Sequence, residues 1–85
     1  MKLEFTRQAQ KDFDALEFNF KKRVEVTLEK MTTQSLHSLQ AKKLRPPYSQ
    51  YYRIRIGDYR IVFKWEKRED RAIIVRIRHR QDVYE

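Results

Sequence analysis

Three runs rich in β-branched and aromatic residues dominate the C-terminal part of the chain. They read YYRIRI, YRIVFKWE and AIIVRIRHR, and the pair Gly57–Asp58 between the first two suits a two-residue type II′ turn. The sequence therefore predicts a meander of three antiparallel strands. Because successive strand residues point to opposite faces, one face is expected to carry Ile54, Ile56, Ile61, Phe63, Trp65, Ile73, Val75 and Ile77.

The other face of the predicted sheet concentrates positive charge. It holds only two apolar residues, Val62 and Ile74, and the nearby acids fall in or next to the turns. Like charges on neighbouring strands are destabilising, and a solvated face usually mixes both signs, so the pattern favours a surface for phosphates. A formal charge of +8 and a pI near 10.0 agree with a polyanionic partner. The cations on this face are Arg53, Arg55, Arg60, Lys64, Arg76, Arg78 and Arg80.

The N-terminal half carries helical periodicity. KLEF at residues 2–5 alternates like a short strand, and Thr6 is a suitable N-cap for a helix over residues 7–16. A second helix is predicted over residues 18–33, and the short connection makes the two an antiparallel helical hairpin. Their apolar stripes are expected to cover the apolar face of the sheet and consist of Ala9, Phe13, Leu16, Phe20, Val24, Leu28 and Met31.

These elements together predict an α+β fold. An N-terminal strand and a helical hairpin pack on one face of a twisted antiparallel β-sheet, in the order β-α-α-β-β-β. Residues 34–50 show no clean period and contain both prolines, so they are predicted to be a loop with room for one helical turn. A chain of 85 residues supports one modest core, and a single domain over residues 1–85 is expected.

Composition excludes several classes of protein and site. The chain has no cysteine, and His37 has no second histidine near it in the sequence, so neither a metal nor a cofactor is expected. No run approaches the roughly 20 apolar residues of a membrane span, and the first residues lack the apolar stretch of a signal peptide; a cytoplasmic protein without a membrane partner is expected. The absence of an acidic pair, a Ser-His-Asp order and a glycine-rich loop argues against proteases, glycosidases and nucleoside triphosphatases.

An ordered set of motifs in the second half carries a resemblance to a known family. The set is a KKLRPP loop, a Tyr-Arg-Ile-Arg strand, a Gly-Asp-Tyr-Arg turn and RHRQDVY near the end. Following a strand and a helical hairpin, it resembles the RelE/ParE superfamily of bacterial and archaeal toxins over nearly the whole chain. The resemblance implies a toxin–antitoxin operon and a cognate acidic antitoxin protein as partner. RelE-like members cleave mRNA in the ribosomal decoding site, whereas ParE-like members poison DNA gyrase.

The end of the chain favours the RelE-like branch, because Arg80 is followed by Tyr84 and ParE-like members typically lack that tyrosine. The resemblance then implies a metal-independent endoribonuclease, an mRNA interferase that inhibits translation and works with the ribosome, its 16S rRNA and the mRNA in the decoding site. In its reaction an RNA 2′-hydroxyl attacks the adjacent phosphate, which needs a proton acceptor, cations and a proton donor. Matched by motif, the implied catalytic residues are Arg53, Arg55, Arg60, Arg80 (or its same-face neighbour Arg78) and Tyr84.

Other cations are expected to bind the RNA backbone without choosing a sequence. Three of them lie around the KKLRPP loop and three on the predicted strands. They are Lys42, Lys43, Arg45, Lys64, Arg76 and Arg78.

Two positions depart from the RelE-like pattern. Arg53 and Arg55 fall where those enzymes carry lysines, and a guanidinium group stays protonated in proteins, so it is a poor base. The remaining titratable candidates in the motif are Tyr84 and His79, although alternation directs His79 to the helix side of the sheet. Two alternatives therefore stay open: a ParE-like DNA gyrase inhibitor, and a non-catalytic or degenerate RNA-binding module.

Overall fold

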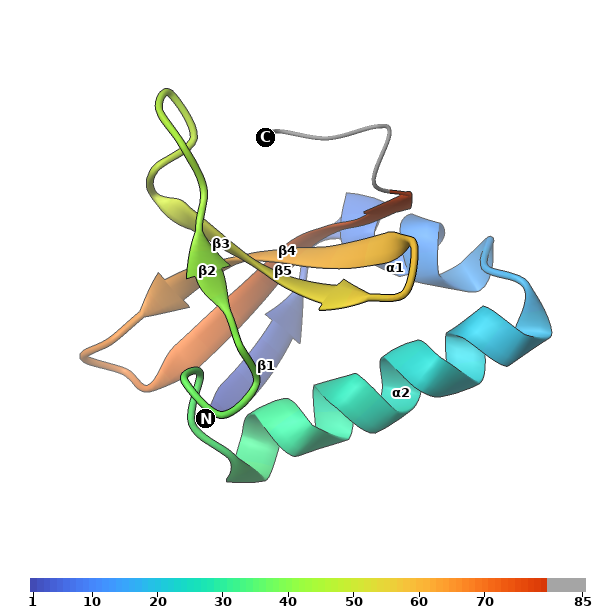
Figure 1. Ribbon diagram of the computed structural model, residues 1–85, viewed down its shortest axis with the longest axis horizontal. Coiled ribbons are helices and arrows are strands. Elements are labelled where there is room, and N and C mark those ends of the chain that lie inside the picture. The colour runs from blue at the N-terminus through green and yellow to red at the C-terminus, as the bar shows by residue number, and fades with distance from the viewer. Residues whose placement is uncertain (80–85) are drawn as a thin grey trace.

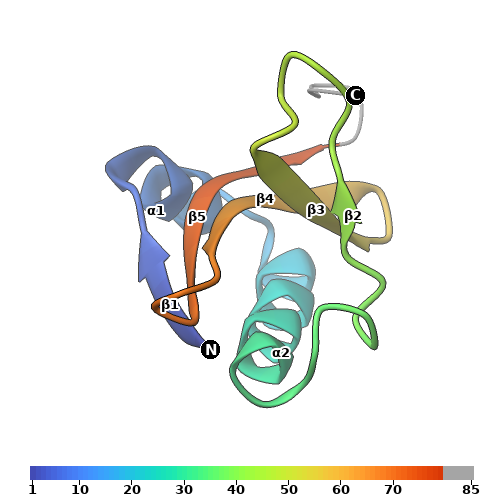
Figure 2. The same cartoon turned by 90° about the vertical axis from the view of Figure 1, so that its left-hand side faces the viewer.

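This computed structural model describes residues 1–79, which form five strands, two helices and the segments that connect them (Figure 1). α2 lies beneath the curved sheet (Figure 2), and residues of both helices pack with strand residues in one core, which confirms the predicted α+β class and the predicted order of the main elements. Neither helix in this part of the chain is long and apolar enough to cross a membrane. The elements are β1 (Lys2–Phe5), α1 (Arg7–Asp14), α2 (Phe18–Thr33), β2 (Lys42–Lys43), β3 (Tyr51–Ile56), β4 (Tyr59–Glu66) and β5 (Arg71–His79).

The sheet is mixed, with the strand order β1-β5-β4-β3-β2. β3, β4 and β5 form the predicted antiparallel meander, and Gly57 has the positive φ (+58°) that a type II′ turn needs at its first residue. β1 pairs with β5 in parallel, from Lys2 opposite Arg71 to Phe5 opposite Ile74. The expectation of a wholly antiparallel sheet was therefore wrong at this edge. The chain between these two strands includes both helices and β2–β4, so it is far longer than the dozen or so residues that parallel neighbours require.

A second edge strand, β2, lies in the segment that was predicted to be loop. Lys42 pairs with Arg53 and Lys43 with Tyr52, both antiparallel. A strand of two residues is too short to show alternation, so no periodic pattern predicted it. The one predicted helical turn is present just before it, where the N–H of Leu39 donates to the Ser35 carbonyl (3.2 Å).

A β-bulge changes which residues of β5 face the helices. Val62 pairs with Arg76 but Phe63 pairs with Ile74, so Val75 is an extra residue on β5. The predicted core positions Ile73 and Val75 are only half-buried, whereas Ala72 and Ile74 are fully buried. The prediction was wrong here because a single inserted residue reverses the faces along the rest of a strand and leaves no periodic signal.

The two helices cover the apolar face of the sheet. α1 follows Thr6, whose side chain accepts a hydrogen bond from the Ala9 N–H (3.1 Å), and it ends at Asp14, two residues before the predicted end. α2 spans the predicted range. Together with strand residues the helices form the core, in which the fully buried side chains are Ala9, Val24, Met31, Ile61, Phe63, Ala72 and Ile74.

On the edge away from β4, the C-terminal half of β5 is held by a side chain in place of a strand. Pairing with β1 ends at Ile74, and beyond it the Asp12 carboxylate of α1 accepts the Ile77 N–H (3.0 Å) and the Arg76 Nε–H (2.8 Å). Burial acts to raise the pKa of Asp12, but hydrogen bonds from Arg76, Ile77 and Gln8 outweigh it and hold the pKa below its ordinary value. We call this group of contacts the Asp12 latch.

Replacing Asp12 by Asn should lower the free energy of unfolding at pH 7 by about 1.5–3 kcal/mol, since hydrogen bonds to a charged group are lost. The lowered pKa means that the carboxylate stabilises the fold above its unfolded pKa of about 3.9 and stops doing so as the pH falls through the folded value. Urea denaturation at several pH values should therefore show the deficit shrinking in acid.

The matched control is Asp14→Asn. Asp14 accepts an equivalent hydrogen bond from the side chain of Gln10 (3.1 Å), as Asp12 does from Gln8, but it is exposed. It should cost less than about 0.5 kcal/mol. Equal losses from the two substitutions would contradict a structural role for the latch.

Candidate nucleic-acid interface

The face of the sheet that points away from α1 and α2 carries two rows of cations. In one row Arg55 pairs with Arg60 and Arg60 with Arg78, so that three arginines lie side by side across β3, β4 and β5. In the other row Lys42 pairs with Arg53, followed by Val62 and Arg76. We call this surface the basic face. Its cations keep the parity expected from the sequence, because the bulge lies before Arg76.

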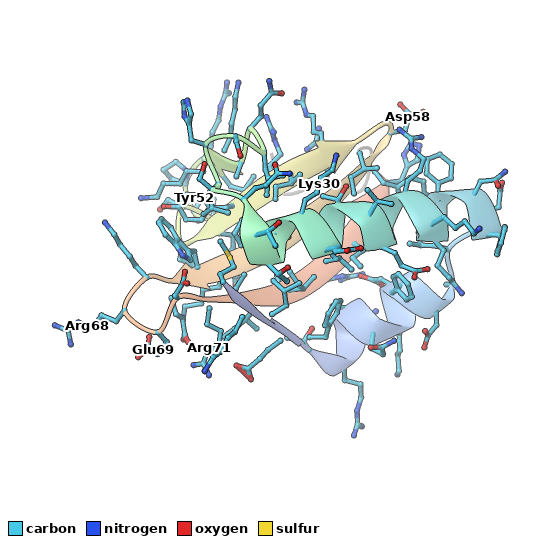
Figure 3. All side chains as sticks on the ribbon, turned by 90° about the horizontal axis from the view of Figure 1, so that it is seen from below. Lys30, Tyr52, Asp58, Arg68, Glu69 and Arg71 are labelled. Carbon is cyan, nitrogen blue, oxygen red and sulfur yellow. The ribbon has the colours of Figure 1, made fainter. Side chains whose placement is uncertain are left out.

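Acidic residues near the basic face are concentrated at the ends of the sheet. Asp58 lies in the β3–β4 turn at one end, and Glu69 lies in the β4–β5 turn at the other (Figure 3). Two further acids bind a cation near the β1 edge, where Arg71 pairs with Glu4 (2.7 Å) and with Glu66. These four acids lie at the margins of the sheet, whereas the paired positions of the two rows hold cations and Val62.

The cations of the basic face differ in burial. Arg53 and Arg60 are only 8% and 5% exposed, and Val62 beside them is fully buried, whereas Arg55 and Lys64 are exposed. Buried side chains are held in place by their surroundings, and a preorganised cation stabilises developing negative charge without reorganisation. The buried pair is therefore suited to a reacting phosphate, and the exposed cations are suited to attracting RNA.

Two grooves open beside β2 and share Lys42, Arg53 and Arg55. The larger, about 450 Å³ in volume, we call the His37 groove, because its remaining walls are His37, Leu39, Gln40 and Ala41. The second, about 440 Å³, is completed by Lys43, Leu44 and Arg45. The pairing of β2 with β3 thus brings the loop cations Lys42, Lys43 and Arg45 next to Arg53 and Arg55. The sequence did not indicate that His37 would join them, because its position depends on the unpredicted strand β2.

Several other predicted site residues do not line these two grooves. Arg76 belongs to the second row but binds Asp12 of α1, which gives it a structural role. Lys64 lies beyond the bulge, between Tyr51 and Ile73. Arg78 is half-buried at the end of the first row. Arg80 and Tyr84 are outside the described residues.

His79 lies on the helix side of the sheet, as its parity predicted. Its ring contacts Tyr59 edge to face, with 5.4 Å between centroids, and Tyr59 in turn packs on Phe20 of α2 (4.6 Å). These contacts direct the imidazole away from the basic face. Among the tyrosines near β3, Tyr52 packs against Phe63 and Trp65 at 5.8 and 5.9 Å.

Comparisons with known proteins agree with this geometry. Residues 3–84 match the family model described as the ParE toxin of a type II toxin–antitoxin system. The curated protein Toxin RelE3 of Methanocaldococcus jannaschii is 34% identical over 88 residues, covering 100% of this chain and 97% of that protein.

Solved structures show the same fold. The RelB–RelE antitoxin–toxin complex of Methanococcus jannaschii matches with 28% identity and a TM-score of 0.75, covering 96% of this chain and 95% of that one. The archaeal RelE–RelB complex of Pyrococcus horikoshii matches with a TM-score of 0.76, covering 96% and 97%. At 17% identity the latter shows the fold alone.

Inorganic phosphate should stabilise the folded protein more than chloride at equal ionic strength, because the basic face places several guanidinium groups together. For a dissociation constant of about 1 mM, about 10 mM phosphate adds roughly 1.4 kcal/mol, or roughly 5–10 °C in Tm for a domain of this size. The double substitution Arg55→Gln, Arg78→Gln should remove most of this gain in thermal unfolding experiments.

The double substitution Lys11→Gln, Lys30→Gln is the control, since it removes the same charge from exposed helix positions. It should leave the phosphate effect nearly intact. If both pairs reduced the effect equally, phosphate would be responding to net charge rather than to the basic face.

Proposed function

The chain belongs to the RelE/ParE superfamily of toxins from toxin–antitoxin systems, and from that premise we propose that it stops translation by cleaving mRNA on the ribosome. The observation that carries the proposal is the row Arg55–Arg60–Arg78 beside the buried Arg53. The full-length similarity to a toxin named RelE3 supports the same choice of branch.

The proposed reaction is an internal transfer at one phosphate of the RNA. The 2′-oxygen loses its proton and bonds to phosphorus, while the bond to the 5′-oxygen breaks and that oxygen takes up a proton. The products are a 2′,3′-cyclic phosphate and a 5′-hydroxyl end. Negative charge on the phosphoryl oxygens is greatest during this exchange, and we assign its stabilisation to Arg60, together with Arg53 and Arg55.

The proton transfers cannot be assigned to these arginines, because guanidinium groups remain protonated. His79 is directed toward Tyr59 on the helix side, so it is a poor candidate. We propose Tyr84 for proton transfer and Arg80 for charge stabilisation, on the strength of their match to the family motif.

The exposed cations provide affinity for RNA. Lys42, Lys43 and Arg45 border the groove next to Arg53, and Lys64 is exposed on the same face. Contacts of this kind hold the phosphate backbone of mRNA or of 16S rRNA in the decoding site, and they weaken with salt.

The proposed protein partner is a cognate antitoxin. Solved relatives with this fold are complexes of RelE with RelB. The formal charge of +8 on this chain suits an acidic partner segment, and association between opposite charges is fast and salt-sensitive.

One observation favours a second candidate function. The matching family model is described as a ParE toxin, and inhibition of DNA gyrase, rather than RNA cleavage, is the activity that the ParE-like resemblance implies.

Expression of the chain without an antitoxin should arrest growth through translation, if it acts as an mRNA nuclease. Pulse labelling should show protein synthesis falling before DNA synthesis, and an Arg80→Ala variant should restore both. If DNA synthesis fell first and gyrase–DNA breaks accumulated, inhibition of DNA gyrase would replace mRNA cleavage as the proposed function.

Substitutions at Arg60 and at Lys42 should affect different quantities, the cleavage rate in the first case and the affinity for RNA in the second. Arg60→Met should lower single-turnover cleavage on programmed ribosomes by on the order of 10²-fold, as the loss of one oxyanion donor does, with little change in binding. The double substitution Lys42→Ala, Lys43→Ala should instead weaken binding and reduce its salt slope by about 2, leaving the saturated rate nearly unchanged.

Unfolding midpoints must accompany these measurements, since Arg60 is buried. A folded Arg60→Met protein that cleaves at the parent rate would remove Arg60 from the reaction.

A further inference from the structure

The His37 groove has two walls of different chemistry. Lys42, Arg53 and Arg55 supply cations on one wall, whereas the turn before β2 supplies His37 and the apolar side chains of Leu39 and Ala41 on the other. A ligand that matched both walls would have an anionic part and a flat, largely apolar part. A nucleotide has both, as a phosphate and a base.

The size of the groove suits a single nucleotide. Its volume of about 450 Å³ is in the range of small-molecule sites, roughly 300–1,000 Å³. Double-stranded RNA is recognised by its shape across a wide minor groove, so a pocket of this size fits an unpaired residue of a single strand.

The turn that carries His37 is fixed by its own hydrogen bonds. The Ala41 N–H donates to the Leu36 carbonyl and the Gln40 N–H to the His37 carbonyl, each at 3.0 Å. Leu36, Leu39 and Ala41 also pack against the core, while His37 remains exposed. The groove is therefore formed before a ligand arrives, and His37 is an exposed part of its lining.

We propose that the His37 groove binds one nucleotide of the RNA substrate, with its phosphate on Lys42, Arg53 and Arg55 and its base stacked on the His37 ring. This inference rests on the proposed RNA substrate and adds a subsite to it. Histidine is one of the side chains on which unpaired RNA bases stack, and stacking accepts any base because each has a π-face.

The first test is an NMR titration of the full chain with a single-stranded RNA trinucleotide, followed through the ring protons of His37. Stacking on a base should move them upfield, whereas inorganic phosphate should perturb Arg53 and Arg55 and produce no upfield shift at His37. Equal effects of phosphate and trinucleotide would reduce the groove to an anion site. An upfield shift with an acidic peptide as large as that with RNA would replace the nucleotide by a protein ligand.

The second test measures binding to ribosomes programmed with mRNA that carries a 2′-deoxy nucleotide at the cleavage position, so that binding is read without cleavage. His37→Ala should weaken binding by roughly 5- to 150-fold, the range for loss of one base–aromatic stack. His37→Phe should restore most of it, because a phenyl ring stacks but has no ring nitrogen. Phe18→Ala is the control, since Phe18 is 66% exposed and begins α2 at the end opposite the turn.

The outcomes are distinct. If His37→Phe were as weak as His37→Ala, the ring nitrogens rather than the ring face would matter, and the stacking proposal would be overturned. If neither variant differed from Phe18→Ala, the groove would not bind RNA on the ribosome. A parent protein that failed to bind ribosomes yet showed the upfield shift with the trinucleotide would overturn the proposed function and leave the subsite standing.

Discussion

The alternation of side chains along β3, β4 and β5 is the constraint on which the rest of the molecule depends. The same three strands place Ile54, Ile61 and Phe63 in the core and Arg53 and Arg60 on the basic face. Repulsion between the cations opposes the sheet, and burial against α1 and α2 must offset it, at roughly 25 cal/mol per Å² of apolar surface. Stability thus comes from one face and the candidate function from the other.

Sequence pattern predicted the elements well where a period ran for several residues. The range of α2, the β3–β4–β5 meander and the side of His79 all follow from apolar spacing. The parts that failed depend on contacts between distant segments: the parallel partner of β1, the two-residue strand β2 and the bulge at Val75. Each of these features is determined by which strand lies alongside and in which register. A run of two to four residues is too short for its apolar spacing to predict that pairing.

For the candidate site, too, the sequence predicted local features but not those that depend on contacts between distant segments. The sequence identified the cations of the basic face, because their parity is local. It did not show that Arg53 and Arg60 would be buried, that Arg76 would bind Asp12, or that His37 would line the same groove as Arg55. These features depend on the register of β2 and on the position of α1. The sequence pattern of α1 predicted which side chains pack in the core, but not that a polar side chain of the helix would bind β5.

The Asp12 latch has a consequence for how the two sides of the molecule communicate. One carboxylate on α1, behind the sheet, holds the backbone of β5 at Ile77, next to Arg78 of the basic face. The same carboxylate also binds Arg76 of the second row, so a displacement of α1 would shift both the backbone and a cation at the β5 end of the basic face. A ligand that moved α1 would therefore move cations on a side of the sheet that it does not itself cover.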